Sequence, residues 1–189
     1  MLTDQEKQLI QRSWRLVIPI AETAADLFYQ RLFELRPEYQ QLFSGDLRAQ
    51  KRKLVRMLAF VVRALDWPDA SWREEVSPEE DLMLVVLALG RRHKVLYKIP
   101  DESYAVVGEA LLWTLKQGLG DAFTDEVKGA WAKIYGLLSK TMRMASAAVD
   151  ALPEEEGVVS ATVVQERGDA ALLEQQAAAG IDDAKLGFV

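Results

Sequence analysis

The chain has 189 residues, half of them apolar, with one histidine and no cysteine. This length suits one domain with a tail, and the lack of cysteine excludes disulfides, thiolate metal sites and cysteine nucleophiles. The formal charge of −6 is uneven, since residues 1–148 carry +1 and residues 149–189 carry −7. A near-neutral main region does not favour nucleic acid or membrane partners, and we expect a cytoplasmic protein without a membrane span.

Apolar residues recur at spacings of three and four along most of the first 148 residues, and no sustained alternation marks a strand. The pattern predicts an all-α protein with a tight corner over residues 37–43. Six main helices are expected near residues 4–18, 20–35, 47–66, 79–97, 101–119 and 124–148. Helices of such unequal length around a corner favour an irregular orthogonal bundle over a four-helix bundle.

Three of the expected helices begin with capping chemistry. Thr3 and Glu6 have the spacing of a capping box, Ser77 precedes a proline and two glutamates, and Thr124 precedes two acids. Prolines that break or begin helices stand at positions 19, 37, 68, 78 and 100. These signals set the helix boundaries given above.

The C-terminal part, residues 149–189, differs in composition. It opens with a turn-rich acidic stretch over residues 153–157, which is typical of a solvated linker. A short helix over 169–179 and a strand over 158–164 are both compatible with the residues there. The composition favours a largely disordered appendage, because it buries too little apolar surface to offset the entropy of ordering.

Few residues can carry chemistry. One histidine and no cysteine exclude a multi-histidine zinc site and a Cys–His pair, and no glycine-rich phosphate loop occurs. Paired acids such as Glu74 and Glu75 diverge on a helix and indicate solvated faces. The basic run over residues 48–56 lacks interleaved aromatic residues, which favours a solvated face or an anchor for an anionic ligand edge over nucleic acid binding.

His93 lies on the apolar stripe of its predicted helix, after Leu82, Val86 and Leu89. A single histidine on such a face is either a core residue with hydrogen-bond partners or a ligand. A one-histidine iron site is chemically sufficient for haem, because the macrocycle supplies the other four nitrogen ligands.

Five blocks of the sequence, in order, resemble bacterial single-domain globins and the globin domain of flavohaemoglobins over residues 1 to about 147. They are Leu27-Phe28-Tyr29-Gln30-Arg31-Leu32-Phe33 with Arg36-Pro37-Glu38 and Leu42-Phe43; Gln50-Lys51-Arg52-Lys53-Leu54; Leu89-Gly90-Arg91-Arg92-His93-Lys94; Tyr104 with Val107-Gly108-Glu109-Ala110-Leu111-Leu112; and Ala130-Trp131 with Tyr135-Gly136. The resemblance implies a globin fold around a haem pocket in residues 1–148, followed by the tail 149–189.

On the proximal side, the resemblance implies that His93 is the axial ligand of the iron of haem b. Tyr104 matches a tyrosine that hydrogen-bonds the region of the proximal imidazole, a contact that would fix the orientation of the ring. A glutamate completes this arrangement in flavohaemoglobins, but its place by ungapped count falls on Ser146. The carboxylate that would push electron density toward the iron is therefore absent.

On the distal side, the resemblance implies that Tyr29 and Gln50 face the bound gas. A phenol and an amide in a dry pocket stabilise polarised O2, each by roughly 1–3 kcal/mol, and the less polar CO less. Leu54 would close the pocket. Without the family, Tyr29 could equally be a buried tyrosine that donates to a carbonyl group.

The remaining site residues would hold the haem itself. Phe43 would press on the haem plane, although a core phenylalanine would make the same contacts. Lys53 and Arg92 would pair with the propionates, or be ordinary surface charges.

Three functions fit these residues. The first is a globin that binds O2, NO or CO and converts NO to nitrate with a separate reductase, since the chain has no room for flavin and nicotinamide domains. The second is a haem-based sensor that signals through its acidic tail. The third is a globin-fold module without haem, which the set of site residues argues against.

Overall fold

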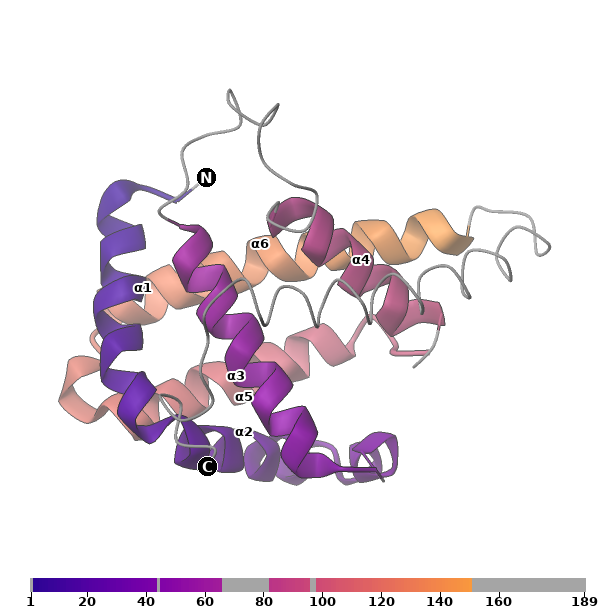
Figure 1. Ribbon diagram of the computed structural model, residues 1–189, viewed down its shortest axis with the longest axis horizontal. Coiled ribbons are helices and arrows are strands. Elements are labelled where there is room, and N and C mark those ends of the chain that lie inside the picture. The colour runs from indigo at the N-terminus through magenta and orange to yellow at the C-terminus, as the bar shows by residue number, and fades with distance from the viewer. Residues whose placement is uncertain (1, 44, 66–81, 96–97, 151–189) are drawn as a thin grey trace. The chain divides into compact units, whose positions relative to one another are not determined.

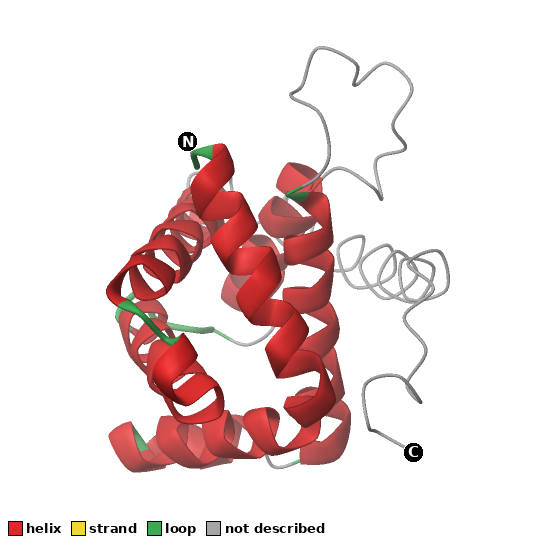
Figure 2. Ribbon diagram, turned by 90° about the vertical axis from the view of Figure 1, so that its left-hand side faces the viewer, coloured by secondary structure: helices red, strands yellow, loops and turns green. Residues whose placement is uncertain are grey.

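The computed structural model describes residues 2–43, 45–65, 82–95 and 98–150, and these residues contain helices but no strand (Figures 1 and 2). The prediction of an all-α chain is confirmed. The α-helices are α1 Asp4–Val17, α2 Ala21–Leu35, α3 Leu47–Ala64, α4 Leu82–Val95, α5 Ser103–Leu119 and α6 Asp125–Asp150. Short 3₁₀-helices connect them: η1 Ile18–Ile20, η2 Pro37–Phe43 and η4 Gly120–Ala122.

The capping signals at both ends of the domain are confirmed. The Thr3 amide donates to Glu6 Oε2 at 2.7 Å, and the Glu6 amide donates to Thr3 Oγ1 at 3.2 Å, which completes a capping box for α1. Thr124 accepts from the Val127 amide at 3.4 Å at the start of α6. The predicted cap at residues 77–80 lies outside the described residues.

Helix boundaries agree with the predicted ones to within about two residues where the chain is described. The corner predicted over residues 37–43 is the 3₁₀-helix η2, because Pro37 has no amide hydrogen with which to continue α2. Helix α6 continues to Asp150, two residues past the predicted end. Residues 82–95 of the predicted helix 79–97 form α4, and the remaining residues of that prediction lie outside the described residues.

The described residues fall into two compact units, which are considered separately. The first contains α1, α2, η2, α3, α5 and the part of α6 up to Tyr135. Its core is centred on Trp131, which is 1% exposed and stacks against Trp14 at a ring distance of 6.2 Å. The Trp131 Nε1 donates to Ser13 Oγ at 2.9 Å, so the polar edge of this buried indole is satisfied.

The second unit contains α4 and the part of α6 from Gly136 onward. Val86 on α4 and Met142 and Ala145 on α6 form its buried apolar residues among those described. Because α4 carries His93, the packing of this unit determines how that histidine is held.

Candidate haem-binding site

Tyr29 lies in a cluster of four aromatic side chains in the first unit. Its ring is 5.2 Å from Phe28 and 5.2 Å from Phe43, both edge to face, and 5.9 Å from Phe33. The preferred edge-to-face geometry adds roughly 0.5–1.5 kcal/mol per pair to the burial of the rings. The structure therefore brings together two of the predicted site residues, Tyr29 on α2 and Phe43 at the end of η2.

The hydroxyl group of Tyr29 makes no hydrogen bond within the part of the chain that the structure describes, although the residue is only 6% exposed. Burial raises the pKa of Tyr29 above its ordinary value, so the phenol keeps its proton at neutral pH. Buried tyrosines usually donate to a partner. The donor of Tyr29 is thus available to a molecule other than the described chain.

Gln50 and Leu54 lie in the N-terminal half of α3, and both are partly buried. This end of α3 is capped by Asp46, whose Oδ1 accepts from the Ala49 amide at 3.0 Å. Lys51 Nζ lies 2.5 Å from Asp26 Oδ1 on α2. Since Asp26 stands one turn before Tyr29, and Lys51 follows Gln50, this ion pair brings together the helix segments that carry the two predicted distal residues.

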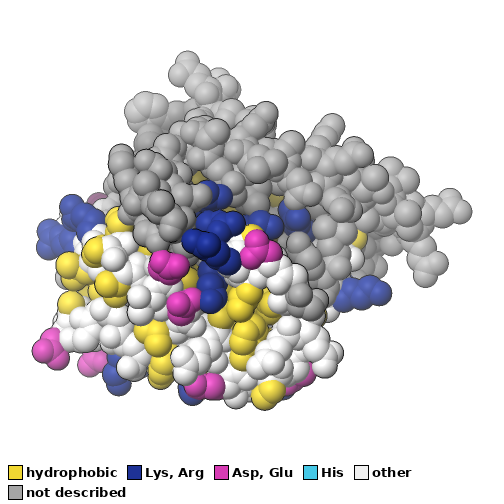
Figure 3. Space-filling view, turned by 60° about the horizontal axis from the view of Figure 1, so that its bottom comes forward, with side chains coloured by type: hydrophobic (Ala, Val, Ile, Leu, Met, Phe, Trp, Pro, Cys, Tyr) yellow, Lys and Arg dark blue, Asp and Glu magenta, His cyan; other side chains and the backbone are white. Residues whose placement is uncertain are grey.

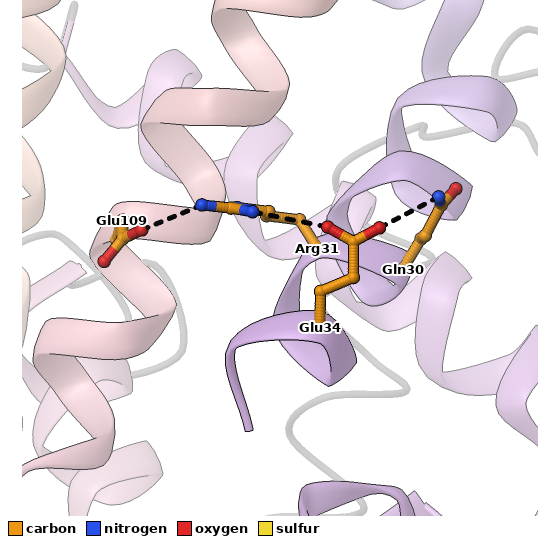
Figure 4. A network of polar contacts seen from close by, with 4 residues as sticks. All are labelled: Gln30, Arg31, Glu34 and Glu109. Atoms are coloured by element: carbon orange, nitrogen blue, oxygen red, sulfur yellow. Dashed lines mark hydrogen bonds and ion pairs between the residues drawn. The ribbon is translucent and has the colours of Figure 1, made fainter. Parts of the chain in front are cut away.

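A network around Arg31 holds α2 against α5 (Figure 4). The guanidinium of Arg31 lies 3.2 Å from Glu109 on α5 and 3.3 Å from Glu34 on its own helix. It also lies over the ring of Trp113 at 5.5 Å. Because the carboxylates are exposed, each ion pair is worth at most about 1 kcal/mol, and the network mainly fixes the register of the two helices.

Tyr104 is buried in the first turn of α5, where Tyr135 of α6 holds the backbone. The hydroxyl of Tyr135 donates to the Tyr104 carbonyl oxygen at 2.5 Å. The Tyr135 ring crosses α5 at Gly108, where an added Cβ would lie 2.6 Å from Cε1 of the tyrosine. Tyr135 thereby positions the start of α5, and the resemblance had not assigned it a role of its own.

His93 is partly buried near the C-terminal end of α4. Burial, assisted by the positive charge of Arg92, lowers the pKa of His93 to about 4. At neutral pH the imidazole is therefore uncharged, which is the form that binds a metal through a ring nitrogen. The His93 carbonyl also accepts from the Ile99 amide at 3.0 Å, which closes the end of the helix.

Helices α4 and α6 approach each other closely at Gly90, one turn before His93. A Cβ at Gly90 would lie 2.6 Å from the Cα of Met142. The hydroxyl of Ser146, itself 4% exposed, donates to the carbonyl oxygens of Gly90 at 3.1 Å and Met142 at 3.0 Å. Ser146, which stands where flavohaemoglobins have a glutamate, thus contacts the helix that carries His93 through backbone groups.

Of the predicted residues at the haem edge, Phe43 is partly buried, Lys53 is exposed and Arg92 is partly buried. Tyr29, Phe43, Gln50, Lys53, Leu54 and Tyr104 belong to the first unit, while Arg92 and His93 belong to the second. The chemistry of these residues is compatible with haem on two counts: the imidazole of His93 is uncharged, the form that can bind iron, and the phenol of the buried Tyr29 has no hydrogen-bond partner among the described residues.

Comparison with known proteins gives the family. The globin family model matches residues 26–142, so the chain belongs to the globin family, and its all-α fold is the globin fold. It is 31% identical over 139 residues to a flavohemoprotein of Rhizobium meliloti (strain 1021), which covers 74% of this chain and 32% of that protein. It is 30% identical over 147 residues to a neuroglobin of Tetraodon nigroviridis, covering 75% of this chain and 90% of that protein.

A flavohemoprotein of Bacillus subtilis (strain 168) is 27% identical over 139 residues, which cover 74% of this chain and 33% of that protein. The chain thus spans about a third of the length of the flavohemoproteins that it matches. Membership of the globin family supports binding of haem and of a diatomic gas at its iron. In the described residues, no helix is long and apolar enough to cross a membrane.

Proposed function

We propose that residues 1–148 form a haem b domain in which His93 is the axial ligand and O2, NO or CO binds on the opposite side, beside Tyr29 and Gln50. The observation that carries this proposal is the hydroxyl of the buried Tyr29, which keeps its proton and has no partner among the described residues. Haem, when bound, supplies an iron that takes up a diatomic gas reversibly.

The protein side chains would tune this binding. The Tyr29 phenol and the Gln50 amide would donate hydrogen bonds to a polar gas ligand, while Phe43 and Leu54 would keep water away from it. Each hydrogen bond to a charged acceptor is worth roughly 1.5–3 kcal/mol. Lys53 and Arg92 would pair with the carboxylates of the haem.

We further propose that the chain, in the cytoplasm, converts NO and O2 to nitrate. This reaction leaves the iron ferric, so each turnover needs one electron from a separate reductase. The likeness to the globin part of flavohemoproteins supports this proposal. Residues 149–189 would be an acidic tail outside the haem domain.

The test of haem binding is the optical spectrum. We expect the purified protein to show a Soret band and to lose it in His93→Ala. A wild-type protein that fails to take up haem would contradict the proposal.

The test of the distal site is the rate of O2 dissociation in Tyr29→Phe. Loss of one hydrogen bond worth about 1.4 kcal/mol or more predicts at least about tenfold faster dissociation, with a smaller effect on CO. The matched control is Tyr39→Phe, because Tyr39 is also buried but its hydroxyl lies 2.7 Å from Ser103 Oγ. Equal rates in wild type and Tyr29→Phe would show that Tyr29 does not face the gas.

One observation favours a second function, a gas sensor that signals through the tail. Helix α6, which contacts α4 at Gly90 through Met142 and Ser146, runs on to Asp150, where the tail begins. A movement of α4 on ligand binding would thus reach the tail along one helix. Hydrogen exchange of residues 149–189 should change when CO binds; unchanged exchange would exclude the sensor.

A further inference from the structure

Helix α3 carries six Lys and Arg residues and no acid among its 18 residues. Four of them, Arg48, Arg52, Lys53 and Arg56, lie within three turns, and we call them the cationic stripe. Within the described part of the chain, Arg48, Arg52 and Lys53 have no ion pair. Lys and Arg side chains gather near the middle of the face drawn in Figure 3, which shows that positive charge is not evenly spread there.

The stripe is electrostatically unfavourable as it stands. Arg48 and Arg52 stand at four-residue spacing, at which like charges repel. Arg48 also lies in the first turn of α3, where the helix dipole favours negative charge and where the N-cap Asp46 is the nearest acid in the sequence. The arrangement therefore favours an anionic group beside the stripe.

We propose that this group is the chain's own acidic tail, residues 151–189, which binds the cationic stripe within the same molecule. The tail carries a net charge of −6, and its acids are spread from Glu154 to Asp183. The four residues of the stripe carry +4, since Lys51 is paired with Asp26 and Arg63 lies outside the stripe, so the tail has enough negative charge to neutralise them. The inference rests mainly on Arg48 and Arg52, which the proposed haem site does not use. A cross-link from Lys53 to the tail would at the same time contradict the proposed pairing of Lys53 with a haem carboxylate.

The tail is long enough to reach the stripe. Asp183 stands 33 residues after the end of α6. A flexible chain of that length has an end-to-end distance of roughly 30 Å, and more than about 100 Å when extended. A domain of this size has a radius of gyration of about 15 Å. Tethering also gives the tail an effective concentration in the millimolar range, which a separate acidic protein would not reach at ordinary concentrations.

A second acidic segment of the chain, residues 66–81, is a poorer fit. It follows α3 directly and is tethered at both ends, to α3 and to α4. Arg48 lies about 26 Å along the helix from Leu65. To reach Arg48, about half of the residues in this segment would have to be fully extended, and the other half would have to span the way back to α4. Residues 151–183 have no such restriction, because they need not return to a second helix of the described chain.

The test is zero-length cross-linking of the full-length protein with a carbodiimide, which joins a lysine amine to a carboxylate with loss of water. We expect monomeric product in which Lys53 is linked to tail carboxylates, identified by mass spectrometry of tryptic peptides. The yield should fall at least about fivefold between 20 mM and 500 mM NaCl, because exposed charges are screened.

Two variants separate the stripe from general charge effects. The double variant Arg48→Glu/Arg52→Glu should lose the cross-link. The control Arg12→Glu/Arg15→Glu makes an equal charge change at exposed positions of α1 and should keep the cross-link.

Three results would overturn the proposal. The first is cross-linking of Lys53 only to residues 66–81. The second is cross-linking only between molecules, which would indicate an anionic surface on another protein as the partner. The third is the absence of any cross-link. Equal yields in the two double variants on α3 and α1 would overturn it as well.

Discussion

Replacement of Gly90 by alanine tests how α4 is held against α6. The added Cβ would lie 2.6 Å from the Cα and 2.9 Å from the carbonyl carbon of Met142, and these backbone atoms cannot rotate away. Overpacking of this kind costs up to about 3 kcal/mol. The higher helix propensity of alanine returns about 1 kcal/mol, so the net loss is roughly 2 kcal/mol.

A loss of that size should lower the melting temperature by about 4–8 °C, measured by circular dichroism. The matched control is Gly136→Ala on α6, where no atom lies within 4 Å of the added Cβ. We expect it to raise stability by about 0.5–1 kcal/mol. If Gly90→Ala were as stable as Gly136→Ala, the close approach of α4 to α6 would be wrong, and with it the account of how His93 is held.

Two further predictions concern the first unit. Lys133 and the Thr3 amide lower the pKa of Glu6 below its usual value, so the contribution of Glu6 to stability is present above its ordinary pKa and is lost as the pH falls below it. Urea unfolding should therefore show Glu6→Gln less stable than wild type at pH 7, and the difference should shrink as the pH falls below the ordinary pKa of a glutamate; a constant difference would contradict the ion pair. Trp131→Phe should lose roughly 2–3 kcal/mol by the same measurement, because it removes the donor to Ser13 and leaves a cavity. Trp113→Phe, at a half-buried position, should lose less than about 1 kcal/mol, and equal losses would contradict the central place of Trp131 in the core.

Local chemistry explains why much of the fold could be predicted. Pro37 ends α2 and starts the corner, and Thr3 and Thr124 cap helices, since each acts on backbone groups within four residues. The end of α6 was less predictable, because residues 145–150 contain no glycine or proline and composition alone suggested a boundary at residue 148. Helix ends without a capping residue are poorly marked in a sequence.

In the candidate site too, some features could be predicted from the sequence and others depend on how the helices pack. Tyr29 and Phe43 are predicted as site residues from their place in a known pattern, and the structure places their rings in contact. The ion pair between Lys51 and Asp26 could not be predicted, since it depends on how two helices cross. Gly90 carried a weak signal, because a glycine within a helix is costly and often marks close packing. Its partner on α6 could be identified only from the structure.

Ser146 stands where the resemblance to flavohaemoglobins places a glutamate, and its chemistry bears on the proposed haem site. A carboxylate at this position could accept a proton from the proximal groups and carry negative charge toward the iron. The Ser146 hydroxyl is uncharged, and its proton is already donated to the backbone of Gly90 and Met142. It can hold α4 in place, but it adds no negative charge beside His93. If haem binds as proposed, stabilisation of the gas must come from the distal side, where the Tyr29 hydroxyl has a proton to give and no partner in the described chain.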